Sequence, residues 1–373
     1  MPKGARVATL KDIAAAAGVS RTTASNAYNR PGKLSAAVRA RILAAARELG
    51  YPGPDPLARG LRTGRVGALG VLLAEALTFA FDDPAAALLL RGVAEVGQLA
   101  DVSLSLVPAP PERPVAAATA TWAVTRAAVD GFLVYHLPDD HPSVPAVLAR
   151  RLPTVVVDGP DLAGVGFVGV DDRGGARQAA EHLLALGHRR IGVLVDRIAA
   201  DAHRGPVDRH RRRGVAGFRA SRLRLAGYAD ALRAAGLAWQ ATPIHECGVP
   251  DRASGHAGAV ALLGRAPRLT AILATTDLLA QGAIQATREL GVPVPAALSV
   301  VGFDDLPDAA GAGLTTVQQP LADKGRVAAR LLLEALDGAT TPAGRVELPT
   351  RLLVRGSTAP PPGRPAATPG ARR

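Results

Sequence analysis

The sequence predicts a small all-α unit at the N-terminus, followed by a much larger α/β body built from two doubly wound halves. Three observations lead to this fold class. Residues 9–50 carry helix caps and helical apolar spacing. A proline-rich stretch follows at 51–65. From residue 66 onward, short apolar runs alternate with helical stretches, which is typical of parallel sheets covered by helices.

The first unit, residues 1–50, is predicted to form three short helices. A side chain that can cap a helix precedes each of them, and glycine follows the first and the third. These residues are Thr9, Ser20 and Ser35 as caps and Gly18 and Gly50 as stops. Only three residues separate the first two helices, and glycine permits the left-handed backbone that so tight a turn needs. The pattern is that of a helix-turn-helix.

Residues 51–65 are predicted to be a linker. Pro52, Pro54 and Pro56 lie within five positions and prevent a continuous helix through this stretch. Pro56 can occupy the first position of a short helix, because no hydrogen-bond donor is needed there. The linker is therefore expected to hold no more than one or two helical turns.

The body, residues 66–357, is predicted to be doubly wound. Its apolar stretches are interpreted as strands, and the amphipathic stretches between them as helices. The predicted strands are 66–73, 102–107, 131–137, 154–158, 191–196, 270–275 and 299–304. The predicted helices are 84–99, 174–186, 221–235, 253–263 and 277–290. This alternation favours largely parallel sheets, and the length suits two α/β halves.

Two segments depart from this alternation. Residues 197–219 include a basic run at 204–213, and we predict a long exposed loop there without an assigned role. Residues 358–373 are rich in proline, alanine, glycine and arginine, a composition typical of a disordered tail.

Basic residues exceed acidic ones, and the excess is concentrated at the N-terminus. The chain of 373 residues carries 44 Lys+Arg against 32 Asp+Glu, a net charge of +12. Residues 1–65 contribute +9 of it. Such an excess indicates a polyanionic partner, either nucleic acid or an anionic membrane surface. Because the excess coincides with a helix-turn-helix, it favours nucleic acid and argues against a membrane.

The remaining composition excludes several classes of protein. The single cysteine, Cys247, excludes a disulfide framework and a cysteine-rich zinc site. No signal-peptide core is present, and no apolar run reaches the roughly 18 residues of a membrane-spanning helix. Nucleophile elbows, phosphate-binding loops, His-Glu-x-x-His and Gly-x-Gly-x-x-Gly motifs are also missing. The sequence thus predicts a soluble cytoplasmic protein that is not an enzyme and has no cofactor or metal site.

A set of short motifs runs in order through the first 65 residues. They are Thr-Leu-Lys-Asp-Ile-Ala from Thr9, Ala-Gly-Val-Ser from Ala17, Thr-Ala-Ser-Asn from Thr23, Leu-Gly-Tyr from Leu49 and Ala-Arg-Gly-Leu from Ala58. With this set, the N-terminal segment resembles the DNA-binding segment of the lac/galactose repressor family of transcription regulators.

The resemblance implies that the second helix lies in the major groove of DNA. Base edges would be read by Arg21, Thr22 and Asn26, since Arg can bind guanine and Asn adenine through two hydrogen bonds each. The DNA backbone would be contacted by Ser20, Thr23, Ser25, Asn29, Lys33 and Arg59. Leu61, in a hinge helix that forms on DNA, would insert into the minor groove. The alternatives are a solvated polar face on a helical bundle and, for Leu61, a simple linker residue.

A second set of motifs runs through the body to about residue 356. They are Glu-His-Leu-Leu from Glu181, Gly-His-Arg-Arg-Ile-Gly from Gly187, Arg-Leu-Arg-Leu-Ala-Gly-Tyr from Arg222, Val-Val-Gly-Phe-Asp-Asp from Val300 and Leu-Thr-Thr-Val-Gln-Gln-Pro from Leu314. They resemble the periplasmic-binding-protein-like core of the same family. The resemblance implies two α/β subdomains with a ligand cleft between them.

Polar residues at or just past the strand ends are candidates for that cleft, because ligands bind beyond the carboxyl ends of parallel strands. Carboxylates suit sugar hydroxyls, and a guanidinium suits hydroxyls or an anion. By the resemblance, the candidate effector contacts are Arg224, Asp304, Asp158, Thr276, Asp277 and, as a stacking ring, Phe81. Asp277 can instead cap its helix, and Phe81 can belong to the core.

The resemblance implies a transcription regulator, expected to be a repressor, that binds operator DNA as a homodimer. Its DNA affinity would change when a small effector, expected to be a sugar or sugar derivative, binds the cleft. The alternative is a ligand-binding protein of the periplasmic type without a role on DNA. The missing export signal and the basic N-terminus favour the regulator.

Overall fold

The structure, a computed structural model, describes residues 8–29, 31–53, 64–73, 81–109, 121–212, 217–338 and 344–363. The chain folds as two units with separate cores, Met1–Gly67 and Ala68–Arg373. Among the described residues, no helix is both long and apolar enough to cross a membrane.

The first unit contains the three predicted helices, α1 (Leu10–Ala16), α2 (Arg21–Asn29) and α3 (Ala36–Glu48), with a 3-10 turn, η1 (Pro31–Lys33). The predicted caps are confirmed. Ser20 Oγ accepts a hydrogen bond from the amide of Thr23 at 3.0 Å, and Ser35 Oγ accepts one from Val38 at 3.4 Å. Gly18, between α1 and α2, has a φ of +61°, the left-handed conformation that the turn requires.

The core of this unit is made of small side chains around Ile13 and Ile42, both fully buried. Ala24 and Ala27 turn one side of α2 into this core. Because residues three and four apart share a helix face, the opposite side of α2 keeps its polar residues near solvent.

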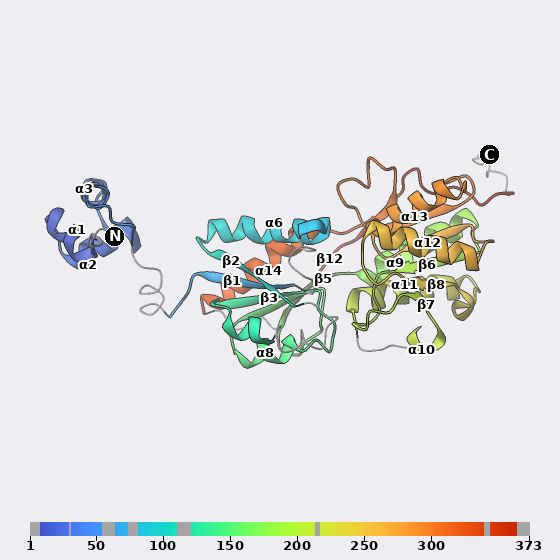
Figure 1. Cartoon of the computed structure of the whole chain (residues 1–373), viewed down its shortest axis with the longest axis horizontal. Helices are drawn as coiled ribbons and strands as arrows, with labels where there is room; N and C mark the ends of the chain where they lie inside the picture. Colours follow the sequence, from blue (N-terminus) through green and yellow to red (C-terminus); the bar gives the residue numbers. More distant parts are fainter. Residues whose placement is uncertain are drawn as a thin grey trace, which may run out of the picture. The chain divides into compact units, whose positions relative to one another are not determined.

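The second unit has two lobes, and the first lobe is a six-stranded parallel sheet with helices on both faces (Figure 1). The strand order is β12-β5-β4-β3-β1-β2, with Val71 of β1 opposite Leu106 of β2 and Leu133 of β3. The strands are β1 (Ala68–Leu73), β2 (Ser103–Pro108), β3 (Gly131–Tyr135), β4 (Thr154–Val157), β5 (Gly166–Val170) and β12 (Arg345–Leu348). α6 (Pro84–Leu99) and α14 (Leu321–Leu336) cover one face, and α8 (Ser143–Ala149) covers the other.

The second lobe is a seven-stranded sheet of order β13-β11-β10-β9-β6-β8-β7, in which the edge strands β7 and β13 are antiparallel to their neighbours. The strands are β6 (Ile191–Val195), β7 (Gly205–Pro206), β8 (Ile244–Glu246), β9 (Ala271–Ala274), β10 (Ser299–Asp304), β11 (Thr315–Gln318) and β13 (Arg351–Leu353). α9 (Asp172–Leu186) and α11 (Arg219–Ala234) pack on one face, and α12 (Arg252–Arg265) and α13 (Asp277–Glu289) on the other.

The two lobes are interwoven. In the described part of the chain, the backbone passes between them three times: after β5, after β11 and between β12 and β13. In each sheet the strand order reverses at one place, between β1 and β3 in the first lobe and between β6 and β9 in the second. Open α/β sheets bind ligands at the carboxyl ends of strands beside such a reversal.

The predicted doubly wound architecture is confirmed. Each predicted strand and helix is present, with bounds that differ by at most two residues. The prediction omitted α8, α14 and the strands β5, β8, β11, β12 and β13. β8 has only three residues, and β5 contains two glycines, so neither carries a strong strand pattern.

The prediction of a long exposed loop over residues 197–219 is confirmed only in part, because most positions from 201 to 210 are exposed but the segment also contains ordered and buried parts. The described part of this segment contains β7 and a helical turn, α10 (Arg209–Arg212). Its two ends, Arg197 and Arg219, are buried. The described part of this segment, called the strap below, runs along the edge of the second sheet, where Val207 donates a backbone hydrogen bond to Ile244.

The folded body also extends past the predicted start of the tail at residue 358. The hydroxyl of Thr358 lies 2.9 Å from His182 Nε2, and the carbonyl of Ala359 lies 2.9 Å from His188 Nε2. These contacts give the two histidines a structural role. Residues 364–373 lie outside the described residues.

Candidate functional site

The candidate DNA-reading residues lie on α2. Arg21 and Thr22 are exposed, and Asn26 is half-buried one helical turn after Thr22. Ser20 and Thr23 at the start of the helix share a hydrogen bond of 2.8 Å between their hydroxyls. Their arrangement is compatible with the predicted docking, in which the first turns of a recognition helix meet base edges.

The other candidate DNA contacts are placed only in part. Lys33 is exposed at the end of η1, and Ser25 is half-buried on α2. Asn29 is the last residue of α2. Arg59 and Leu61 lie outside the described residues, so their proposed roles remain predictions.

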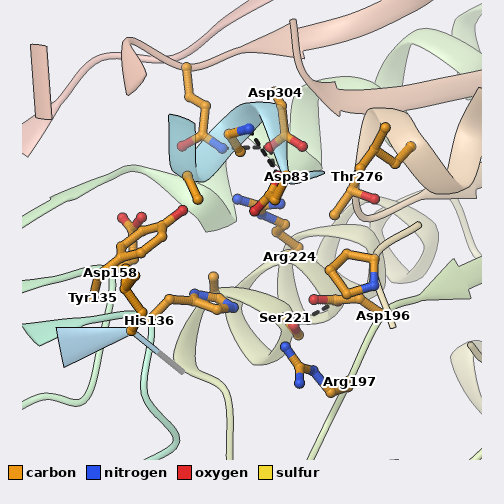
Figure 2. Close-up of a pocket in the computed structure, with 17 residues that line it drawn as sticks. Asp83, Tyr135, His136, Asp158, Asp196, Arg197, Ser221, Arg224, Thr276 and Asp304 are labelled. Atoms are coloured by element: carbon orange, nitrogen blue, oxygen red, sulfur yellow. Dashed lines mark hydrogen bonds and ion pairs between the residues drawn. The ribbon is translucent and has the colours of Figure 1, made fainter. Parts of the chain in front are cut away.

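A cavity of about 80 Å³ lies between the two lobes of the second unit. Its walls come from the carboxyl ends of both sheets, as the fold class predicts. Figure 2 shows Tyr135, His136 and Asp158 of the first lobe on the left and Thr276, Ser221 and Asp196 of the second lobe on the right. Both reversals of strand order lie at this cavity. The strands that flank them also end there, namely β1 and β3 in the first lobe and β6 and β9 in the second.

Three residues of the cavity wall have a strained backbone. Their φ angles are positive: +54° at His136, +63° at Asp158 and +127° at Asp304. Each such residue costs about 1–3 kcal/mol, and strain of this kind is concentrated in ligand sites and switches. The backbone therefore places these side chains at some cost to stability, which supports a functional role for the cavity.

A chain of buried polar groups crosses the floor of the cleft. Lys324 Nζ, on α14 of the first lobe, donates to Asp158 Oδ2 at 2.5 Å and to Gln319 Oε1 at 2.7 Å. Gln319 follows β11, and its amide nitrogen donates to Asp304 Oδ1 at 2.5 Å. Asp304 Oδ1 is 3.5 Å from Arg224 Nη1 on α11. The chain thus connects side chains of both lobes through Gln319.

Arg224 is held from several directions. Its Nε donates to Asp172 Oδ1 at 2.9 Å, its Nη1 donates to the carbonyl of Thr275 at 2.5 Å, and its guanidinium lies 3.8 Å from the ring centre of Phe303. Asp172 begins α9, directly after the first crossing between the lobes. Arg224 therefore belongs both to the cavity wall and to the connection between the lobes.

Two carboxylates of the wall have acceptor capacity left for a ligand. Asp158 Oδ1 is buried and receives no hydrogen bond from the described residues. Asp196 accepts from the hydroxyls of Ser221 and Thr275 through Oδ1, at 2.8 and 3.0 Å. An unpaired buried carboxylate oxygen is costly, so Asp158 Oδ1 indicates a site for a hydrogen-bond donor.

Burial shifts the protonation of several wall residues. It lowers the pKa of His136 to about 4, so this imidazole is neutral at neutral pH. It raises the pKa of Asp83, although the backbone amides of Ala85 and Ala86 act in the opposite direction. Burial also raises the pKa of Asp304 to about 7, against the opposing effects of Arg224 and Gln319.

The raised pKa of Asp304 predicts a loss of stability as pH rises from about 4 to about 7, because folding then requires a carboxylate in a buried site. In an Asp304→Asn variant the side-chain oxygen can still accept from Gln319, and no charge forms. We expect the variant to lose less stability than the wild type between about pH 5 and about pH 8. Urea unfolding at both pH values measures this difference, and parallel losses in the two proteins would contradict the assignment.

The structure brings four of the six candidate effector contacts together: Arg224, Asp304, Asp158 and Thr276 line the cavity. Thr276 also caps α13, because its Oγ1 accepts from the amide of Leu279. Asp277 is not on the wall. It is fully buried and accepts from Thr316 Oγ1 and from the amide of Leu306 at 2.5 and 2.8 Å. The expected contact of Asp277 with an effector is therefore corrected: in this structure its side chain stabilises the fold.

Phe81 is also corrected. Its side chain is 71% exposed and is not among the residues that line the cavity, so the structure does not support its expected stacking on a ligand ring. Several wall residues were missed in the sequence, namely Asp83, Tyr135, His136, Asp196, Arg197, Ser221 and Gln319. Asp196 is the last residue of a predicted strand. The argument that polar residues at strand ends face the cleft, which selected Asp158, would therefore have selected Asp196 as well.

The strap at residues 197–219 also shapes the cavity. Glu246, fully buried at the end of β8, accepts from the amide of Ile198 at 2.7 Å. Arg211 of the strap binds the same carboxylate through Nε and Nη2, and it also binds Asp201 at 2.6 and 2.8 Å. Because Ile198 follows Arg197 of the wall, Arg211 fastens the strap to the segment that carries Arg197.

We expect Arg211→Ala to lower the free energy of unfolding by about 1.5 kcal/mol, the loss of a hydrogen bond between charged groups. The remaining Glu246 keeps the amide of Ile198, and water can enter from the side of the exposed Asp201. Arg209→Ala, at an exposed arginine of the same turn, is the matched control and is expected to change stability by less than about 0.5 kcal/mol. Urea unfolding compares them; equal effects would contradict the role of Arg211.

The fold and the two sites define a class of protein: a transcription regulator with a helix-turn-helix unit and a two-lobed, periplasmic-binding-protein-like body. Residues 9–53 match the bacterial regulatory proteins of the lacI family, and residues 180–358 match a periplasmic binding protein-like domain. The chain belongs to the LacI family.

Known proteins resemble this chain in sequence or in structure over nearly its whole length. The HTH-type transcriptional regulator Rv3575c of Mycobacterium tuberculosis is 45% identical over 362 residues, which cover 97% of this chain and 99% of that protein. A transcriptional regulator CelR–cellobiose complex has a TM-score of 0.67 at 31% identity, covering 94% of this chain and 99% of that one. A lac repressor dimer bound to operator and the anti-inducer ONPF has a TM-score of 0.76 at 27% identity, covering 95% of this chain and 100% of that one.

These comparisons confirm the predicted family and fold class. They also confirm a DNA-binding regulator rather than an enzyme, because the family consists of transcription regulators. The alternative of a ligand-binding protein without a role on DNA is thereby wrong.

Proposed function

We propose that this regulator is a cytoplasmic repressor that binds operator DNA as a homodimer and changes its DNA affinity when a neutral sugar or sugar derivative binds between the lobes. The lac repressor, crystallised as a dimer on its operator, supports the first part. The CelR–cellobiose complex supports a sugar as ligand. The observation that carries the proposal for this chain is the cavity wall, with the unpaired Asp158 Oδ1 on one lobe and Asp196 and Asp304 on the other.

For DNA, we assign base reading to Arg21, Thr22 and Asn26. The backbone contacts are Ser20, Thr23, Ser25, Asn29, Lys33 and Arg59, with Leu61 as the minor-groove wedge. The exposure of Arg21, Thr22 and Lys33 supports this assignment. We assign residues 1–50 to the DNA-binding domain, 51–65 to the hinge, 66–357 to the effector domain and 358–373 to the tail, of which residues 358–359 contact the body.

For the effector, we assign direct contacts to Arg224, Asp304, Asp158 and Thr276. Four carboxylates line the cavity, those of Asp83, Asp158, Asp196 and Asp304, against two guanidinium groups. Hydroxyl groups can donate to these oxygens, whereas a phosphate would be repelled by those that carry a negative charge. The wall therefore favours a neutral polyhydroxylated ligand over a sugar phosphate.

Coupling between effector and DNA follows from the buried chain of polar groups. A ligand hydroxyl that donates to Asp158 Oδ1 binds the carboxylate whose Oδ2 accepts from Lys324, a member of the buried chain of polar groups that connects the lobes. A ligand shifts a conformational equilibrium only by binding one state more tightly, and a ligand that contacts this chain binds more tightly to the arrangement of the lobes that places Asp158 and the facing wall within its reach.

Two measurements test the proposal. DNA selected by the protein from a random pool should contain an enriched, roughly palindromic sequence, as a dimer of helix-turn-helix units requires. A thermal-shift screen should show stabilisation by a neutral sugar, loss of that stabilisation in Arg224→Ala, and none by the matching sugar phosphate. Enrichment of no sequence, or stabilisation by sugar phosphates alone, would contradict it.

A further inference from the structure

A second hollow lies in the second lobe, away from the cleft. It is a groove of about 460 Å³ beside the amino ends of β6, β8 and β9. The cleft, in contrast, is formed at the carboxyl ends of β6 and β9. The groove is therefore separated from the proposed effector site by the length of the strands.

The floor of the groove is apolar. Leu232 of α11 forms part of it together with Leu237 and Leu269, and Ile191 and Pro243 stand at the starts of β6 and β8. A floor of this composition binds the apolar part of a small molecule, because burial of apolar surface is favourable.

The rim of the groove carries three exposed arginines, Arg189, Arg190 and Arg268. Arg189 Nη1 donates to the carbonyls of Leu184 and His188 at 3.0 and 2.9 Å, and Arg190 Nε donates to the carbonyl of Arg268 at 2.6 Å. Among the described residues, none of the three forms an ion pair with a carboxylate.

Some other exposed arginines of the same body form ion pairs. Arg173 and Arg252, for example, bind Asp230 and Asp308. The positive charge at the groove is thus concentrated beside apolar surface and left without acidic partners in the described structure. Guanidinium groups bind carboxylate and phosphate oxygens through paired hydrogen bonds.

We propose that this groove is a second ligand site, separate from the cleft, for an amphipathic anion: an apolar ring or short acyl chain that ends in a carboxylate or phosphate. The apolar part lies against Leu232, Leu237 and Leu269. The oxyanion accepts hydrogen bonds from Arg190 and Arg268 at the rim.

The test uses the full chain and the fluorescent anion 8-anilinonaphthalene-1-sulfonate as probe. Octanoate and octyl phosphate should displace the probe, whereas octanol at the same concentration should not. The more effective of the two anions identifies the preferred head group. Displacement by octanol as efficient as that by both anions would overturn the proposal, because the arginines would then contribute nothing.

Variants locate the binding. In Arg190→Ala/Arg268→Ala the probe affinity should fall by about tenfold or more, the effect of losing a charged hydrogen bond. Arg330→Ala, at an exposed arginine on α14 of the other lobe, should leave the affinity unchanged. Ala241→Trp places a large side chain in the groove and should abolish binding with thermal unfolding preserved. Unchanged probe affinity in both groove variants would overturn the proposal.

Discussion

Arg21→Ala is expected to bind the selected operator about ten- to a hundredfold more weakly than the wild type. The reason is that a pair of hydrogen bonds from arginine to one guanine contributes about 1–3 kcal/mol of discrimination between bases. The guanidinium is exposed at the first position of α2, so its removal leaves the core of Ala24, Ala27 and Ile42 intact. Affinity for random DNA should fall much less, since non-specific binding depends on the total charge. Fluorescence anisotropy with both DNAs measures the two effects.

Arg41→Ala is the matched control for Arg21→Ala. Arg41 is an exposed arginine on α3 of the same unit, so both variants lose one positive charge. Arg41→Ala should weaken binding to operator and random DNA by similar factors. If Arg21→Ala does the same, Arg21 contacts the backbone and does not read bases.

Lys324→Met is expected to lower the free energy of unfolding by about 3–5 kcal/mol, the cost of removing one partner from a buried ion pair. Lys324 is fully buried, and its ammonium group is the donor to Asp158 Oδ2 and to Gln319 Oε1. Methionine fills a similar volume, so the loss comes from the uncompensated carboxylate rather than from a cavity. Urea unfolding measures the change.

The double variant Lys324→Met/Asp158→Asn separates charge from packing. It removes the carboxylate that Lys324→Met leaves alone, and we expect it to regain a substantial part of the lost stability. A single variant as stable as the wild type would contradict a strong ion pair. A double variant less stable than the single one would show that the carboxylate is not the source of the loss.

The sequence predicted the elements of the fold well where the apolar pattern was strong. β10 and α6 have the predicted bounds, because each is a long apolar or amphipathic run with clear ends. The strap was misread only in part, where two of its arginines suggested solvent. Arg211 and Arg212 instead bind Glu246 and the carbonyls of Trp239 and Thr242, partners that lie 27–35 residues away.

The sequence predicted some residues of the candidate cleft and missed those that depend on contacts between distant parts of the chain. Arg224, Asp158 and Asp304 follow from strand ends and from the family motifs. Lys324 and Gln319 do not, because their function depends on the backbone crossing between the lobes after β11. Asp277 follows a strand, as the prediction required, but its side chain packs into the sheet instead of facing the cavity. It occupies the space beside Gly302, where a Cβ atom would collide with Asp277 Oδ1.

Effector-dependent control of operator binding is tested most directly by fluorescence anisotropy of the selected DNA, titrated with the neutral sugar that gives the largest thermal shift. For the wild type, the proposed coupling predicts a change in operator affinity of about 5- to 150-fold on saturation with the sugar, as coupling energies of 1–3 kcal/mol give. Asp158→Asn, which alters the unpaired Oδ1 and the bond of Oδ2 to Lys324, should bind operator without sugar yet respond to sugar much less. An operator affinity that is the same with and without the bound sugar in the wild type would contradict allosteric control through the cleft.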